Sequence, residues 1–220
     1  MGRQVRLTTI NDGGLMTRGR QPGEGKARVL DAGLHVFRAK GYAATTVDDL
    51  CSVAGVTKGT FFHYFKTKED LAVAAADYWG EMVDREFGSA PYQLLTDPVE
   101  RVLGYIDYRR SLLRGDLADY TCLLGTLVQE TYDLHPRIRV ACDRHISGPA
   151  GLLAADIAAA MQSRDIQADW TAESLALFTQ SVLQGAFVLA KAKQGPQVAI
   201  DSVDHLRRYL ELLFTKGDVL

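Results

Sequence analysis

TTVDDLCSVAGVTKGTFFHYFKTK, residues 45–68, is the stretch of this chain that decides its fold. It predicts two short helices, over about 46–54 and 57–64, that meet at Gly55. Gly55 suits the left-handed turn that lets the second helix leave the first at a steep angle. Such a pair is a helix-turn-helix, whose second helix can enter a major groove about 12 Å wide.

Threonines at three helix starts support this prediction. Thr46, Thr57 and Thr67 each suit an N-cap, where a hydroxyl oxygen accepts a hydrogen bond from a backbone N–H. Asp49 and Asp70 follow Thr46 and Thr67 by three residues, which is the spacing of a capping box. The caps would fix helices that are too short to be held by intrinsic propensity.

The second short helix predicts a small surface for contact with DNA. Lys58 can donate to guanine, Thr60 can contact a thymine methyl group, and Gly59 lets the backbone approach the bases. Phe62 offers an apolar face, although packing in the core is the alternative for Phe62 and for Tyr64. Phosphate contacts are expected from the end of this helix and the start of the next. The predicted DNA-binding residues are Thr46, Thr57, Lys58, Gly59, Thr60, Phe62, His63, Tyr64 and Lys68, while Val47, Leu50, Val56, Phe61 and Phe65 are expected in the core.

Residues 26–72 resemble the N-terminal domain of the tetracycline repressor (TetR) family. The segments that carry the resemblance are Ala32 to Gly41, Thr45-Thr46-Val47 and the run from Ala54 to Leu71. The resemblance implies a DNA-binding transcriptional regulator with an all-helical C-terminal domain that dimerises and binds a small effector. Phe62 departs from the family, in which many members carry tyrosine here, so it can offer only apolar contact.

Composition and charge favour a cytoplasmic protein that binds DNA through its N-terminal third. The 220 residues are 47% hydrophobic and 24% charged. No apolar run reaches the ~18 residues of a membrane span or forms a signal peptide. Residues 1–70 carry 11 basic and 7 acidic side chains, whereas the whole chain carries 25 and 27, so the basic part can face phosphate. The three cysteines form no CxxC pair, so neither a disulfide framework nor a zinc site is expected.

The chain as a whole predicts an all-α fold of about nine helices. Besides the two short helices, apolar residues recur at helical spacing over about 25–40, 68–87, 97–114, 118–132, 136–162, 171–193 and 198–215. A disordered arm is expected over 1–24, in which Met16 could be the true start. A DNA-binding domain is expected over 25–72 and an effector-binding and dimerisation domain over 73–220. Pro149 is expected to kink or break its helix.

The last two helices predict a homodimer. The segment 171–193 is apolar on more than one face, and 198–215 carries another apolar stripe. Two such helices from each subunit would form a four-helix interface, and the dimer would present two recognition helices to a pseudo-palindromic operator. The alternative is that 171–193 is simply the central core helix of a monomer.

Polar residues in the second domain are the candidates for the site of an unknown small-molecule effector. They are Tyr105, Tyr108, Cys122, Gln129, Tyr132, His145, Gln180 and Gln184, and each could equally be a satisfied polar group of the core. The segment from Cys122 through Glu130 to Ile138 also resembles a TetR subgroup in which some members sense electrophiles or oxidants through a cysteine. A nearby Lys191 would favour the reactive thiolate, whereas an inert buried cysteine is the alternative.

A ligand-responsive repressor is the leading interpretation, and an activator with the same DNA-binding domain is the alternative. An enzyme has no support, because the chain has no GxSxG, phosphate-loop or HExxH motif and its five histidines lack ligand spacing. No catalytic residue, cofactor or metal is expected.

Overall fold

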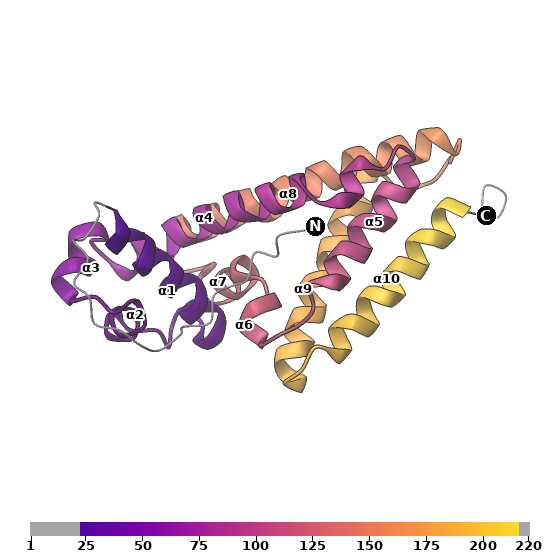
Figure 1. The fold of residues 1–220 in the computed structure, drawn as a ribbon. Coiled ribbons are helices and arrows are strands. Elements are labelled where there is room, and N and C mark those ends of the chain that lie inside the picture. The colour runs from indigo at the N-terminus through magenta and orange to yellow at the C-terminus, as the bar shows by residue number, and fades with distance from the viewer. Residues whose placement is uncertain (1–22, 216–220) are drawn as a thin grey trace.

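The computed structural model describes residues 23–215, and all regular elements in this range are helical (Figure 1). The range contains ten α-helices, where about nine were expected, and one short 3-10 helix, η1. The bounds are α1 Glu24–Lys40, α2 Val47–Ala54, α3 Lys58–Tyr64, α4 Lys68–Gly88, η1 Pro91–Leu94, α5 Pro98–Ser111, α6 Leu117–Tyr120, α7 Leu123–Thr131, α8 Pro136–Ser163, α9 Ala172–Lys193 and α10 Gln197–Thr215. Most of the arm predicted over 1–24, with Met16, lies outside the described residues, and α1 begins at Glu24.

Two helix predictions need correction. The helix expected over 118–132 is two helices, α6 and α7, because the backbone is extended at Thr121 and Cys122. The Cys122 sulfur caps α7 by accepting a hydrogen bond from the Gly125 N–H at 3.5 Å. The kink or break expected at Pro149 is not a break, because α8 continues through this residue, and a kink there stays a prediction. Packing of α8 against α4, α5 and α9 offsets the backbone hydrogen bond that proline removes.

Helices α1 to α3 build the predicted helix-turn-helix at one end of the molecule (Figure 1). The expected caps are present on α2, α3 and α4, at Thr46, Thr57 and Thr67. Gly55 adopts the left-handed conformation expected for the turn, with φ 58° and ψ 43°. The residues expected in the core are buried or partly buried: Val47, Leu50, Val56, Phe61 and Phe65.

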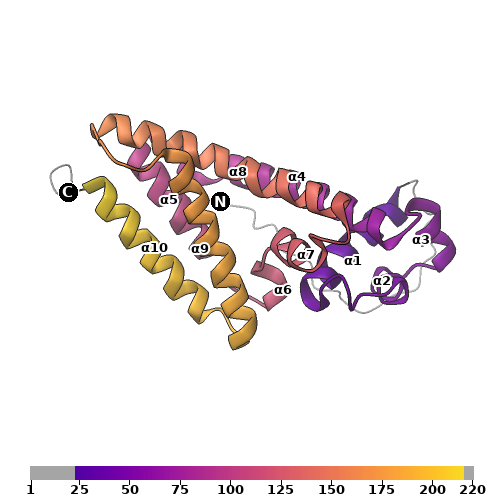
Figure 2. The ribbon, with the colours of Figure 1, turned by 180° about the vertical axis from the view of Figure 1, so that it is seen from behind.

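Helices α4 and α8 are the long elements that join the two ends of the molecule. They lie side by side in Figures 1 and 2, and α4 follows α3 after a short turn. The far half of α8 packs with α5 and α9, α10 packs on both of these, and the short α6 and α7 lie beside α1. A 21-residue helix such as α4 is about 30 Å long, so it connects the helix-turn-helix to the far end.

The buried apolar residues form two clusters that share α4 and α8. The near cluster, around Phe37, Phe61 and Leu127, joins α1 to α4 with α7 and the start of α8. The far cluster, around Ile106 and Leu183, joins the end of α4 with η1, α5, α8, α9 and α10. The domain boundary expected after residue 72 therefore falls inside α4, and α7 contributes its buried apolar residues to the near cluster.

Helix α9 is long and apolar enough to span a membrane by length and composition. It packs against α8 and α10, and Leu183, Ala186 and Ala190 belong to the far cluster. The core helix of a soluble protein passes the same test, and this packing is typical of a core helix.

Candidate nucleic-acid interface and effector site

Helix α3 presents an exposed face at the end of the molecule. Lys58, Gly59, Phe62 and His63 are exposed, and their spacing of one and four residues places them on one side of the helix. The Phe62 ring is 45% exposed and meets the buried Phe61 ring edge-on, with 5.3 Å between the ring centres. The face therefore offers a cation, a bare backbone position and an apolar ring to a groove of DNA.

Lys58 is paired with Asp48 of α2 in the free protein. Its Nζ lies 2.8 Å from Asp48 Oδ1, and both side chains are largely exposed. The hydrogen bond to Asp48 and the charge of its carboxylate raise the pKa of Lys58, so the ammonium is charged at neutral pH. An exposed pair of this kind is weak, and a guanine or a phosphate can replace the carboxylate as its partner.

The threonines and Tyr64 of the predicted interface have structural partners. Thr46 caps α2, and the hydroxyls of Thr57 and Thr60 lie 3.0 Å apart. Tyr64 is partly buried and lies against Gly25 of α1, where an added Cβ would be 3.0 Å from its Cε2 atom. These residues maintain the shape of the exposed face, and their contacts with DNA stay predictions.

Lys68 is placed differently from the phosphate anchor that the sequence predicts. Its ammonium donates to the carbonyl oxygens of Tyr42 and Thr45 at 2.7 and 2.8 Å, and lies 4.2 Å from the centre of the Tyr42 ring. Burial lowers the pKa of Lys68. Because two of its three donors already have carbonyl partners, we assign Lys68 a structural role in the loop before α2.

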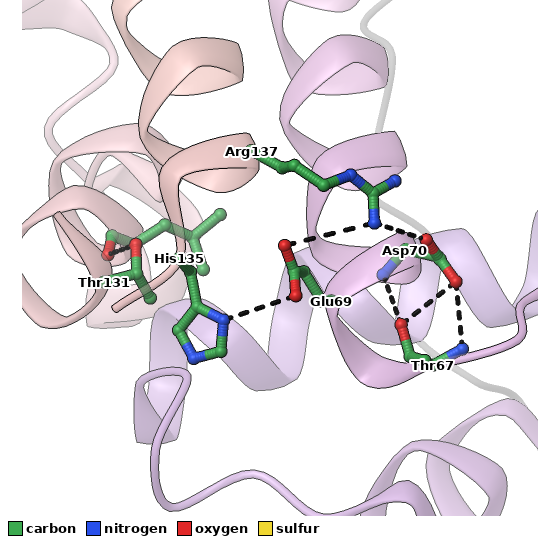
Figure 3. A network of polar contacts seen from close by, with 7 residues as sticks. Thr67, Glu69, Asp70, Thr131, His135 and Arg137 are labelled. Atoms are coloured by element: carbon green, nitrogen blue, oxygen red, sulfur yellow. Dashed lines mark hydrogen bonds and ion pairs between the residues drawn. The ribbon is translucent and has the colours of Figure 1, made fainter. Parts of the chain in front are cut away.

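A polar network ties the first turn of α4 to the start of α8 (Figure 3). Arg137 Nη1 lies 2.9 Å from Asp70 Oδ1 and 4.0 Å from Glu69 Oε1. His135 Nδ1 lies 3.4 Å from Glu69 Oε2, so His135 and Arg137 approach Glu69 from two sides in Figure 3. Hydrogen bonds from Arg137 and Thr67 lower the pKa of Asp70, which keeps this carboxylate charged in weak acid.

The loop before α2 contacts the same junction of α7 and α8. Glu130 Oε2 accepts a hydrogen bond from the Ala43 N–H at 2.8 Å, and the His135 ring meets the Tyr42 ring edge-on at 4.9 Å. The helix-turn-helix therefore contacts this junction both before α2 and after α3. The sequence did not predict these contacts, because the Ala43 and Glu130 partners are 87 residues apart and leave no local pattern.

The predicted effector residues are not gathered into one site. Gln129 and Tyr132 are exposed, and 64% of the Tyr132 surface is open to solvent. His145 Nε2 lies 3.0 Å from Asp77 Oδ1, and the His145 ring occupies the space beside Gly80. Gln129 and Tyr132 therefore do not face inward as expected, and contact of any of these three residues with an effector stays a prediction.

A small cavity lies among four elements at the far end of α4. Its volume is about 40 Å³, and among the predicted effector residues it is lined by Tyr105. The Tyr105 hydroxyl accepts hydrogen bonds from Arg109 Nε at 3.0 Å and from the buried Gln180 Nε2 at 3.1 Å. Tyr108 lies next to the cavity, where its ring packs against Phe87. The lining residues are Val83, Asp84, Phe87, Gly88, Tyr92, Gln93, Tyr105, Arg109, Pro149, Leu152, Leu153 and Asp156.

Among residues 23–215, Arg109 is the one cation that lines this cavity, and no sequence pattern predicted it. Its guanidinium lies 4.1 Å from the centre of the Phe87 ring and 5.2 Å from that of Tyr105. Tyr105 and Arg109 are four residues apart on α5, so they share one face of the helix. This spacing from a predicted effector residue could have indicated Arg109.

Cys122, Gln184 and Lys191 form a second polar group, between α7 and α9. Lys191 Nζ donates to Thr126 Oγ1 at 2.6 Å, and the Gln184 side chain packs on Gly125. Burial lowers the pKa of Lys191, and an electrostatic interaction with Cys122 partly opposes the shift. Lys191 therefore lies near Cys122, as the sequence predicted.

Two family models match the chain. Residues 29–75 match the tetR family of bacterial regulatory proteins, and residues 98–206 match the tetracyclin repressor-like C-terminal domain. Together the two matches cover more than half of the chain. The chain belongs to the tetR family.

Relatives and solved structures agree with this assignment. The transcriptional regulator AcuR of Cereibacter sphaeroides is 32% identical over 123 residues, which are 51% of this chain and 52% of AcuR. The HTH-type transcriptional repressor DhaR of Mycobacterium sp. is 24% identical over 170 residues, 77% of this chain and 84% of DhaR. The crystal structure of regulatory protein TetR from Rhodobacter sphaeroides has a TM-score of 0.74 at 25% identity, over 84% of this chain and 98% of that one.

Membership of the tetR family confirms the all-α fold and the DNA-binding helix-turn-helix that the sequence predicted. The family consists of DNA-binding transcriptional regulators rather than enzymes. The chain also matches two Bacillus subtilis regulators, YerO and YxaF. It spans 52% of the length of AcuR, 28% of YerO and 63% of YxaF.

Proposed function

We propose that this tetR-family protein is a transcriptional repressor that binds a pseudo-palindromic operator as a homodimer and releases it when a small effector binds. The observation that carries the proposal is the course of α4. Its first turn, at Glu69 and Asp70, contacts the junction of α7 and α8 next to the helix-turn-helix. Its last turn, at Phe87 and Gly88, lines the cavity. A ligand that displaces the last turn can therefore change the orientation of α3.

The outer face of α9 and α10 supports the homodimer. Ser181 and Gly185 are exposed between larger apolar residues of α9, so a partner helix can approach closely. The Phe178 ring of α9 meets the Tyr209 ring of α10 at 5.5 Å, which makes the two helices one continuous face. An apolar face of this kind is typical of a subunit interface. Its large exposed side chains are Leu177, Phe178, Val188, Leu189, Tyr209 and Leu212.

Sedimentation tests the homodimer, for which we expect twice the chain mass of 24.2 kDa. Leu189→Glu should give monomers, because a buried unpaired carboxylate opposes association. Leu134→Glu is the matched control, since Leu134 is exposed in the loop before α8 and should leave the dimer intact. A Leu189→Glu protein that stays as dimeric as the control would remove this interface from the proposal.

Selection of bound sequences from a random DNA pool, at a stated salt concentration, tests operator binding. We expect enrichment of a palindrome, and Lys58→Ala should relax base preference at one position of each half-site. Lys66→Ala is the matched control, because Lys66 is exposed just beyond α3. Equal effects of both variants on all sequences would remove Lys58 from base reading, and a pool without enrichment would overturn the proposal.

A reporter under the selected operator, in a strain without the gene, separates a repressor from an activator. Expression should rise when the gene is absent, and a fall would favour activation. A cytoplasmic location follows from the proposal, because the operator DNA of a bacterial regulator lies there.

Sensing of an electrophile or oxidant by Cys122 is a second candidate function, favoured by the charges around it. Lys191 and the buried Arg38 both interact electrostatically with Cys122. Burial lowers the pKa of Arg38 to about 10, so the Arg38 guanidinium is charged at pH 7, and a nearby cation increases the reactivity of a cysteine. Mild alkylation of the native protein, followed by mass spectrometry, should modify Cys122 and spare the buried Cys142. An unmodified Cys122 would exclude this candidate.

A further inference from the structure

The cavity beside α4 contains a cation, Arg109, that has no counter-ion among the residues that the structure describes. Of the five N–H donors of Arg109, only that of Nε has a partner among residues 23–215, the Tyr105 hydroxyl at 3.0 Å. No carboxylate of the described chain pairs with Arg109, and its guanidinium lies instead over the Phe87 ring. A partly buried guanidinium with four unused donors favours the binding of an anion.

Tyr92 adds a second donor to the same cavity. Gln93 Nε2 donates to the Phe87 carbonyl oxygen at 3.3 Å and to the Tyr92 hydroxyl at 3.1 Å. Because a carbonyl oxygen only accepts, the orientation of the Gln93 amide is fixed and the Tyr92 oxygen is the acceptor in that bond. The Tyr92 O–H therefore has no acceptor within the described part of the chain. Burial raises the pKa of Tyr92 to about 12, so the phenol keeps its proton at neutral pH.

The carboxylates that line the cavity limit the charge of a ligand. Asp156 Oδ1 accepts a hydrogen bond from Arg101 Nε at 2.8 Å, so the charge of the Asp156 carboxylate is largely neutralised. Asp84 is exposed at the rim and has no such partner in the described part of the chain. A dianion such as phosphate would meet repulsion from Asp84, whereas a single negative charge can be balanced by Arg109. The planar fork of a guanidinium matches a carboxylate in geometry.

The remaining lining is apolar and opens toward solvent beside α8. Leu152 lines the cavity and is 66% exposed, so an apolar body can lie along it while the charged end is inside. The cavity of about 40 Å³ is too small to enclose a whole drug-sized ligand, which needs roughly 300 Å³ or more. A ligand larger than the charged group must therefore extend outward or separate α4 from α8.

We propose that this cavity binds a small monocarboxylate with an apolar body, whose carboxylate is held by Arg109 and Tyr92. The inference depends on the proposed function only in treating this anion as the effector, since the binding itself involves no DNA. A carboxylate that draws the Arg109 guanidinium off the Phe87 ring would change the packing of the last turn of α4. That change would reach the helix-turn-helix through α4.

Calorimetric titration with benzoate, benzamide and benzylammonium tests the charge and shape of the ligand. These probes share a ring and differ in charge. Benzoate should bind at least tenfold more tightly than the other two, because only benzoate can accept from Arg109 and balance its charge. Equal binding of benzoate and benzamide, tighter binding of benzylammonium, or no binding of benzoate would overturn the proposal.

Variants of the two donors test the assigned residues. Arg109→Gln should weaken benzoate binding about 10- to 100-fold, and Tyr92→Phe about 2- to 10-fold. Arg114→Gln is the matched control, because it removes the same charge from an exposed position just beyond α5 and should leave benzoate binding unchanged. Arg109→Lys, which keeps the charge without the fork, should fall between wild type and Arg109→Gln. A loss of equal size in Arg109→Gln and Arg114→Gln would remove Arg109 from the site.

Operator binding by the same variants distinguishes the two proposals. If the Arg109→Gln protein still binds the selected operator, the variant is folded. We then expect that benzoate no longer dissociates this variant from the operator. Operator binding without any benzoate affinity would reject the carboxylate site and leave the repressor standing. Benzoate affinity without any operator binding would support the site and reject the repressor.

Discussion

Helix α3 and the cavity differ in the sequence separation of the residues that form them. Around α3 the caps join residues three positions apart, as in the bonds from Asp49 N–H to Thr46 and from Thr60 N–H to Thr57. The cavity is lined by residues of α4, η1, α5 and α8, from Val83 to Asp156. A short motif therefore reveals the first region, whereas the second exists only once distant helices have packed.

The two regions also belong to different core clusters, joined by α4 and α8. The near cluster supports an exposed face, and the far cluster borders a small cavity that opens toward solvent beside α8. Because the two clusters are separate, substitutions can disturb DNA contact and ligand contact independently. Each of the following substitutions tests how independent they are.

Phe61→Ala should have the largest effect, because it removes a fully buried ring from the near cluster. We expect a loss of about 3–5 kcal/mol in the free energy of unfolding of that cluster, and loss of operator binding. Benzoate binding in the far cluster should persist. Denaturant unfolding of proteins that keep a single tryptophan measures the stability of each cluster separately. Trp79 packs on the near cluster and Trp170 on the far one. If Phe61→Ala lowers the free energy of unfolding equally at both tryptophans, the two clusters unfold as one cooperative unit.

Lys68→Gln should have the next largest effect and tests the structural role assigned to this lysine. Loss of its two charge-assisted bonds to backbone carbonyls should lower the free energy of unfolding by about 1–2 kcal/mol. The slope of log operator affinity against log salt should stay unchanged. Lys66→Gln, at an exposed position, is the control for stability. If the slope falls by about one unit, Lys68 contacts a phosphate after all.

Gly59→Ala should leave the free energy of unfolding unchanged or raise it by up to ~1 kcal/mol, because alanine favours helix. Among the described residues, the added Cβ meets only Thr57 Oγ1, at 3.7 Å. Operator affinity should nevertheless fall if the backbone of α3 approaches the bases there. Gly148→Ala in α8 is the matched control, since its Cβ meets no atom of the described residues within 4 Å and it lies far from α3. Unchanged operator affinity in both variants would contradict the close approach.

Arg137→Gln should have the smallest effect, confined to acid stability. Arg137 and Thr67 lower the pKa of Asp70, so folding favours the charged carboxylate. The resulting stability is present above the unfolded pKa of about 3.9 and is lost as pH falls through the lower folded pKa. Melting temperatures should therefore fall less steeply below about pH 4 in Arg137→Gln than in wild type. Arg139→Gln, exposed on the same helix, should match the wild type.

Local patterns were enough to predict most of the near region. The three threonine caps, the Gly55 turn and the buried Phe61 and Phe65 all lie within a stretch of 24 residues. The same patterns failed where tertiary packing decides. The division between α6 and α7 and the unbroken course of α8 through Pro149 both depend on neighbouring helices. The helix propensities of single residues do not include contacts with those neighbouring helices.

By itself the sequence determined the helix-turn-helix, the all-α fold and the family, because caps, turns and apolar spacing act between residues that are close in the chain. Only the tertiary structure decided what Lys68 and Arg109 do. Lysine and arginine side chains are mostly exposed in proteins. The Lys68 ammonium nevertheless donates to the carbonyls of Tyr42 and Thr45, and the Arg109 guanidinium lies over the Phe87 ring with no counter-ion among residues 23–215. The partners of a long charged side chain depend on which elements the fold brings beside it, and those lie 22 to 26 residues away in these contacts.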